Sequence, residues 1–212
     1  GGAARPRAAA MWRRSSSSLS ERVASGVARR SGREYERIMR SFPVRDGARL
    51  HETVPPSRWC VTRADLQQLK TLVEHAVRCG RLLPTARDPF DTADRAMGPS
   101  VFSVIEQVVA PITLSRGRPS WALMLHPDGL ECHLFVTHCW EEGLYEFVDK
   151  VLHSWPRAAR HAYCCMLSNP QNLDLGSLLS SPRTSPFAQA LRSASCTLVV
   201  PNSSCSIYTR IW

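Results

Sequence analysis

Polar residues follow three apolar segments of this chain, each at the point where the segment ends. Residues 134–138 (LFVTH) lead into CWEEG, residues 161–168 (HAYCCMLS) into NPQN, and residues 196–200 (CTLVV) into PNSS. Amide, imidazole, carboxylate and hydroxyl groups can hold a small polar ligand by hydrogen bonds, and the indole of Trp140 can either stack on a nucleotide base or cover the core. The plainer alternative is that these loops are polar because they face water.

Cysteine and histidine are concentrated in the same part of the chain, at Cys132, His133, His138, Cys139, Cys164 and Cys165. Neighbouring side chains on a strand point to opposite faces and the chain has no C-x-x-C pair, so we predict no metal site. We expect all eight cysteines to be reduced and mostly buried. Cys139 with His138 is not favoured as a nucleophile with its base, because neighbours in sequence rarely align and no third group is evident to orient the imidazole.

Strands and helices are predicted to alternate over the region that carries these residues. We expect strands at 134–138, 161–168 and 196–200, and helices at 143–155 and 185–194. The strand segments are continuously apolar, which is typical of a parallel sheet covered by helices on both faces. The pattern predicts a parallel, doubly wound α/β sheet, in which the polar strand exits share one edge. That edge would gather His138, Trp140, Glu141, Asn169, Gln171, Asn202 and Ser203.

The region before these strands contains two predicted helices. Thr62 and Asp65 form a capping-box pattern, and apolar residues then follow helical spacing as far as Gly80. A second helix is expected over 99–110, opened by Pro99 and closed by Pro111. The Pro-Asp-Gly turn at 127–129 separates two apolar runs, and we expect a strand on each side of it.

The positive charge of the chain is concentrated at its N-terminus. The formal net charge is +9, and residues 1–50 alone hold 12 arginines against four acidic residues, a net of +8. We therefore expect a basic, largely disordered tail over 1–57, a helical segment over 58–120 and an α/β region over 121–212. A solvated or organelle-targeting segment is the first interpretation of the tail, and phosphate binding is the alternative. The cysteines favour an intracellular, cytoplasmic location.

Several of these segments together resemble a known family. The stretch HLFVTHCWEEG is similar to the first signature of TIR (Toll/interleukin-1 receptor homology) domains, and SIYTRIW at 206–212 is similar to the start of their W-C-x-x-E helix. The combination with NPQN, SPFAQAL and LVVPN resembles TIR-like proteins of unicellular algae, over about residues 133–212. In this resemblance Thr137, His138, Glu141 and Glu142 match the strand signature, and Trp212 matches the tryptophan of W-C-x-x-E.

The resemblance implies a partial flavodoxin-like fold, self-association or association with other TIR-like domains, and NAD as a substrate cleaved at its glycosidic bond. The candidate NAD-binding residues are Thr137, His138, Trp140, Glu141, Asn169, Gln171, Asn202 and Trp212. The catalytic glutamate of that motif is expected after Trp212, so we predict no catalytic residue in this chain and no NAD turnover by it. The alternatives are a non-enzymatic interaction module and nucleic-acid binding by the arginine-rich tail.

Overall fold

A four-stranded sheet forms the centre of the protein, as seen in the computed structural model, which describes residues 8–173, 176 and 180–201. The strands are β1 (Val61–Thr62), β2 (Leu134–Thr137), β3 (His161–Cys164) and β4 (Cys196–Val199), in the spatial order β1-β3-β2-β4. β2 is parallel to both β3 and β4, whereas β1 is antiparallel to β3. The predicted α/β class and the parallel direction of three strands are confirmed.

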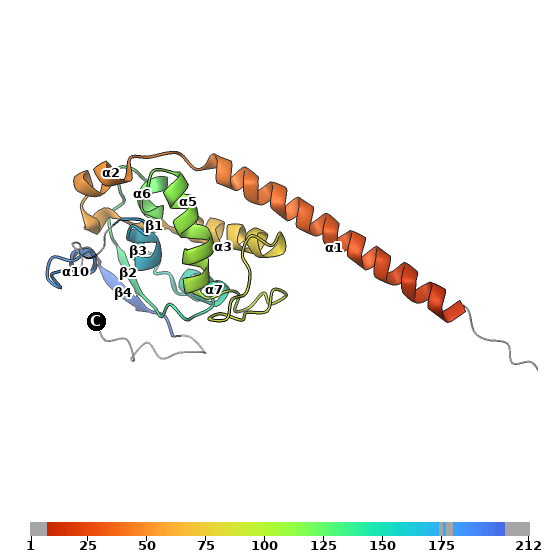
Figure 1. Cartoon of the computed structure of the whole chain (residues 1–212). Coiled ribbons are helices and arrows are strands. Elements are labelled where there is room, and N and C mark those ends of the chain that lie inside the picture. Colours follow the sequence, from red (N-terminus) through yellow and green to blue (C-terminus); the bar gives the residue numbers. More distant parts are fainter. Residues whose placement is uncertain (1–7, 174–175, 177–179, 202–212) are drawn as a thin grey trace, which may run out of the picture.

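Both faces of β2 and β3 are covered, which explains their uninterrupted apolar segments, whereas one face of β4 is exposed at Thr197 and Val199. Leu134 and Val136 face the main cluster, with α3 (Arg63–Arg78) and α7 (Leu144–Ser154), while Phe135 and Tyr163 face a second cluster that includes Trp59 and Ala190 of α10 (Pro186–Ser193). Figure 1 shows these helices around the sheet. The helices predicted over 62–80, 143–155 and 185–194 are confirmed. The Thr62–Asp65 capping box is present, with Asp65 also accepting a hydrogen bond from His126 at 2.8 Å.

The helix predicted to end before Pro111 continues past it. It comprises α4 (Val101–Val104), a π-helical segment η2 (Ile105–Val109) and α5 (Ala110–Ser115). A proline ring inside a helix clashes with the preceding turn and cannot donate a hydrogen bond. The wider π turn, in which the Ala110 amide bonds to the Ile105 carbonyl, relieves that conflict immediately before Pro111. The predicted end of this helix was therefore wrong.

Two segments expected as strand are helical instead. Residues before the Pro-Asp-Gly turn form α6 (Trp121–Leu125), because the Ser120 hydroxyl accepts a hydrogen bond from the Leu123 amide and caps a first turn. The expected strand 161–168 ends at Cys164, and the rest forms α8 (Cys165–Ser168). The Ser168 hydroxyl accepts a hydrogen bond from the Cys164 amide at 3.0 Å and stabilises this abrupt change of direction.

The N-terminal region, expected to be largely disordered, is helical where it is described. It forms α1 (Ala8–Ser41), α2 (Gly47–Thr53) and a 3-10 turn η1 (Pro56–Arg58). Tyr35, Ile38 and Phe42 recur at helical spacing and are buried in the main cluster, which fixes the end of α1 against the body. The rest of α1 projects away from the sheet (Figure 1). Among the described residues, no helix is both long and apolar enough to cross a membrane.

Candidate functional site

His138 lies at the carboxyl end of β2, where it forms the centre of a buried polar cluster. Its side chain is enclosed, with 1% of the residue exposed. Nδ1 lies 2.7 Å from Oε1 of Glu142, and Nε2 lies 3.4 Å from Sγ of Cys165. The imidazole also packs on the ring of Phe147 from α7, with centroids 4.6 Å apart. Both ring nitrogens are therefore engaged by protein groups.

The surroundings of His138 favour its charged form. Burial alone would lower the pKa of His138, but the electrostatic effect of Cys165 and hydrogen bonds with Cys164, Cys165 and Glu142 outweigh it and hold this pKa well above its usual value. Glu142 is itself fully buried, and burial raises the pKa of its carboxyl group despite the opposing effect of His138. Oε2 of Glu142 has no hydrogen-bond partner in the described part of the chain.

Cys165 is brought to His138 by the parallel pairing of β2 and β3. Val136 is in register with Cys164, so the residues just beyond each strand meet at the same edge. Cys165 is the first residue of α8 and is 5% exposed. The indole Nε1–H of Trp140 lies 3.4 Å from Cys165 Sγ, while the Trp140 ring meets Phe102 edge-on. The sulfur thus lies between an imidazole and an indole.

A segment from the preceding helix region holds the loop that carries Glu142. The Val101 amide donates to the Glu142 carbonyl at 3.0 Å, and the Leu144 amide donates to the Pro99 carbonyl at 2.8 Å. Gly143 is required between them, because a Cβ atom there would lie 2.1 Å from the carbonyl oxygen of Met97. The close approach of these two backbones fixes the direction in which Glu142 enters the cluster.

The other predicted site residues have separate roles. Asn169 is buried and its Oδ1 accepts a hydrogen bond from the Tyr163 hydroxyl at 2.6 Å, while Gln171 donates to the carbonyls of Met166 and Asn169. Glu141 is exposed, and Thr137 is half-buried. His138, Trp140 and Asn169 are therefore gathered at the carboxyl edge of β2 and β3, as expected. Asn202, Ser203 and Trp212 lie outside the described residues.

An apolar groove lies beside this edge, between α10 and the strands β2 and β4. It has a volume of about 540 Å³. Its walls combine apolar side chains with hydroxyl groups and are formed by Phe135, Thr137, Pro182, Ser185, Phe187, Ala188, Leu191 and Thr197. Of the predicted ligand-binding residues that the structure describes, Thr137 is the one that lines it. Apolar walls with a few hydroxyl groups are typical of sites for small molecules.

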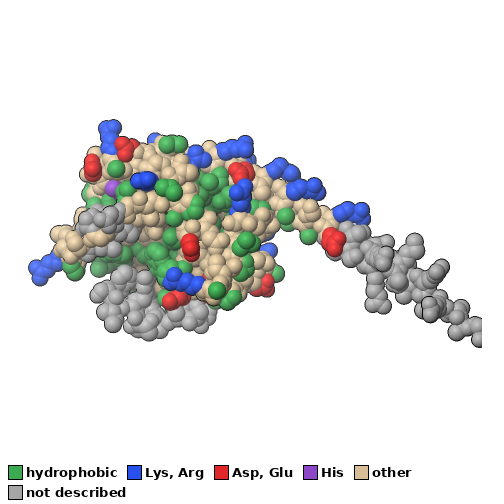
Figure 2. All heavy atoms as spheres, in the orientation of Figure 1, with side chains coloured by type: hydrophobic (Ala, Val, Ile, Leu, Met, Phe, Trp, Pro, Cys, Tyr) green, Lys and Arg blue, Asp and Glu red, His purple; other side chains and the backbone are tan. Residues whose placement is uncertain are grey.

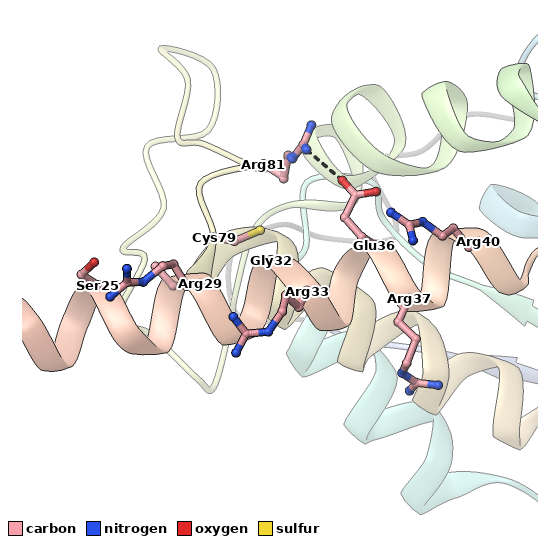
Figure 3. A pocket seen from close by; sticks show the side chains of 10 residues that line it. Ser25, Arg29, Gly32, Arg33, Glu36, Arg37, Arg40, Cys79 and Arg81 are labelled. Carbon is pink, nitrogen blue, oxygen red and sulfur yellow. Dashed lines mark hydrogen bonds and ion pairs between the residues drawn. The ribbon is translucent and has the colours of Figure 1, made fainter.

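A second, strongly basic hollow lies far from the sheet edge, where α1 passes the C-terminal end of α3. It measures about 760 Å³, and its lining includes Arg29, Arg33, Arg37, Arg40 and Arg81. Figure 3 shows that the first four arginines come from α1, and that Arg81 bonds to Glu36 across the gap. Arg37 pairs with Glu34, whereas Arg29, Arg33 and Arg40 make no ion pair with any described residue.

The cysteines only partly match the expectation of eight reduced thiols. Cys60, Cys79, Cys132, Cys164, Cys165 and Cys196 are reduced, but Cys139 is disulfide-bonded, and Cys205 lies outside the described residues. In residues 8–173, 176 and 180–201, no group of three or more His, Cys, Asp or Glu side chains is arranged to hold a metal ion. Comparison of the chain with family models, with curated proteins and with solved structures found no match.

The partner of His138 differs from the neighbour that the sequence offers. Cys139 is the next residue along the chain, but it is Cys165 that approaches the ring from the neighbouring strand, and Glu142 orients it. The four-residue spacing from His138 to Glu142 was visible in the sequence. The approach of Cys165 becomes visible only once β2 and β3 are placed side by side.

Proposed function

We propose that this chain is a TIR-like α/β module that self-associates and binds NAD beside the carboxyl edge of its sheet. The observation that supports this best is the strand order. β2, β3 and β4 follow one another along the chain but lie in the order β3-β2-β4, all parallel. This second-first-third order is the one with which a flavodoxin-like sheet begins, and such sheets bind ligands where the strand order reverses.

The reversal falls between β2 and β4, next to the apolar groove. Thr137 and Thr197 contribute hydroxyl groups from these two strands, and Phe187 contributes an aromatic ring from α10. An aromatic wall with a few hydroxyl groups suits a nucleotide base, which offers a flat face and hydrogen-bonding edges. Cleavage of NAD at its glycosidic bond is the associated reaction that the TIR resemblance implies, with a carboxylate stabilising the positive charge that develops on the ribose.

Self-association is supported by the outer side of β4. This strand pairs with β2 alone within the described residues, and Val199 is 49% exposed. Leu191 of α10, which lines the groove, is exposed to the same extent. An apolar edge strand of this kind can pair with the same strand of a second copy. A second copy of this chain, or another TIR-like domain, is the partner we propose.

The proposal is tested by titrating the full chain with NAD in a calorimeter while its oligomeric state is followed by light scattering. Thr197→Arg places a long charged side chain in the groove at an exposed position, so we expect at least tenfold weaker NAD binding. Thr71→Arg, at an exposed position of α3, is the matched control and should bind NAD like the wild type. Absence of NAD binding by the wild type at millimolar concentration contradicts the nucleotide function, and self-association without it favours the non-enzymatic interaction module.

A second candidate function, polyanion binding by α1, is favoured by the arrangement of its arginines. Arg22, Arg29, Arg33 and Arg40 are spaced by seven, four and seven residues, which places them along one side of the helix. Figure 2 shows basic side chains repeated along α1. This side is opposite the one that buries Tyr35 and Ile38, so the arginines remain accessible to phosphate groups. The simpler role is a solvated helix surface.

Salt dependence separates these two roles of α1. If four arginines contact phosphates, the affinity for a single-stranded oligonucleotide should fall with a log–log salt slope of about −3, roughly 50-fold between 50 and 200 mM salt. Fluorescence anisotropy measures this affinity. The double variant Arg29→Glu, Arg33→Glu should lose most of the binding, whereas the charge-matched pair Arg157→Glu, Arg160→Glu, on an exposed loop of the body, should retain it. Equal loss in both variants would show that only net charge matters.

A further inference from the structure

We propose that Cys165 is a reactive nucleophilic thiol whose thiolate is stabilised by His138 and Trp140, with Glu142 orienting His138, and that its substrates are small hydroperoxides. This site is distinct from the groove proposed for NAD. The proposal rests on three contacts within one buried cluster at the carboxyl ends of β2 and β3.

The first two contacts reproduce the order carboxylate, imidazole, nucleophile. Glu142 Oε1 lies 2.7 Å from His138 Nδ1, so the carboxylate accepts a hydrogen bond from the N–H at that position, and Nε2 faces the sulfur at 3.4 Å. Cysteine nucleophiles are activated by this arrangement, in which the base is held by a third group. The cluster is enclosed, so its charges are screened little by water.

The third contact is independent of the histidine. The indole Nε1–H of Trp140 lies 3.4 Å from Cys165 Sγ, and an indole nitrogen can only donate a hydrogen bond. The sulfur therefore acts as an acceptor toward Trp140. Hydrogen bonds of this kind are stronger when the acceptor is charged, so the contact favours the thiolate over the neutral thiol.

None of the other buried cysteines of the described chain lies between an imidazole and an indole. The thiols of Cys60 and Cys132 share a hydrogen bond, and this hydrogen bond together with burial raises the pKa of Cys60. The hydrogen bond from Cys60 lowers the pKa of Cys132, but no described histidine or indole nitrogen is paired with that sulfur. Burial raises the pKa of Cys164, despite its hydrogen bond with His138. Cys165 is 5% exposed, which limits attack to small reagents. A hydroperoxide is the smallest common electrophile that a thiolate attacks directly.

The reaction requires no further cofactor. The Cys165 thiolate attacks the terminal oxygen of the hydroperoxide ROOH, so an S–O bond forms and the O–O bond breaks. The leaving alkoxide takes a proton from the His138 imidazolium and departs as ROH. The sulfur is oxidised to the sulfenic acid Cys–SOH, the peroxide is reduced to the alcohol (water when R is hydrogen), and His138 is left neutral.

The wild-type chain provides the first test without any substitution. The protein is treated with hydrogen peroxide and dimedone, which traps sulfenic acids, and each cysteine is quantified by mass spectrometry. If exposure alone controlled oxidation, the half-exposed Cys79 and Cys196 would be labelled first. We expect Cys165 to be labelled at least tenfold faster than either. Labelling of Cys165 no faster than that of buried Cys60 would overturn the proposal.

A pair of conservative variants tests the role of the indole. Trp140→Phe keeps an aromatic ring but removes the donor to Cys165, and we expect labelling of Cys165 to slow about tenfold. Trp155→Phe removes a comparable donor, which bonds to the Ala159 carbonyl at the other end of α7, and should leave Cys165 labelling unchanged. Circular dichroism checks that both variants are folded. A rate in Trp140→Phe equal to that of the wild type would contradict the assigned role of the indole.

Discussion

Replacing His138 by alanine is expected to lower the free energy of unfolding by about 3–5 kcal/mol. The substitution leaves the carboxylate of Glu142 fully buried without the partner that lies 2.7 Å away, and it removes the ring that packs on Phe147. An unpaired charge in the interior costs far more than the attraction within the pair contributes. Chemical denaturation of the full chain measures the loss.

Two comparisons identify the cause of that loss. His153→Ala removes the same side chain from an exposed position at the end of α7 and should change stability by less than about 0.5 kcal/mol. The double variant His138→Leu, Glu142→Leu replaces the buried pair by apolar side chains, so it should be more stable than His138→Ala alone. A loss below about 1 kcal/mol in His138→Ala would show that Glu142 is not held in a buried pair.

The sheet was the part of the fold that local sequence pattern could predict. An unbroken apolar run at 134–137 indicates a strand covered on both faces, and both Leu134 and Phe135 are indeed buried, on opposite sides. The parallel direction followed from the helices predicted between the strands, which are long enough to return the chain to the same end of the sheet.

Predictions were wrong where an apolar run is compatible with both a strand and a helix, and where a high arginine content drew attention away from helical spacing of apolar residues. The run HAYCCMLS fits a strand and a buried helix equally well. In the structure the strand ends at Cys164, where the amide donates a hydrogen bond to the Ser168 hydroxyl. In the N-terminal region the arginines suggested disorder, although Tyr35, Ile38 and Phe42 already showed the spacing of a buried helix face. At Pro111 a π turn, which no local rule predicts, keeps the helix intact.

The location of the site at one edge of the sheet could be predicted from the sequence, whereas the contacts between its side chains could not. Parallel strands require that His138 and the residues after β3 share an edge, and this was inferred from the sequence. The contact between His138 and Cys165 depends on the register of β2 against β3, which a single sequence does not reveal. That register also brings the sulfur of Cys165 to His138 and Trp140, two of the residues predicted to bind a ligand.

The NAD site and the Cys165 site can fail independently. Thr197→Arg alters the groove, whose lining does not include Cys165, whereas Trp140→Phe removes a donor to Cys165 and leaves the groove lining as it is. Loss of NAD binding with unchanged Cys165 oxidation would support both assignments. If oxidation of Cys165 abolished NAD binding, the result would show that the groove and the Cys165 site act as a single site.

The central claim is that the parallel strands bring His138 between Glu142 and Cys165 in a closed cluster, and the titration of the His138 ring measures this directly. In the folded protein the pKa of His138 is raised above the usual value, which is about 6.5. The protonated ring therefore contributes its full stabilisation of the folded state below about pH 6.5, and this contribution is lost as the pH rises through the folded pKa. Stability should therefore depend on His138 most strongly at and below about pH 6.5.

The measurement is a ¹H–¹⁵N NMR titration of the imidazole nitrogens in the full chain, with Glu142→Gln and Cys165→Ser for comparison. An exposed imidazole titrates at about pH 6.5. We predict that His138 in the wild type keeps both ring protons well above that pH, and that each substitution lowers the titration midpoint of His138. A wild-type midpoint at or below that of an exposed imidazole, unaffected by either substitution, would contradict the arrangement of strands and loops described for this edge of the sheet.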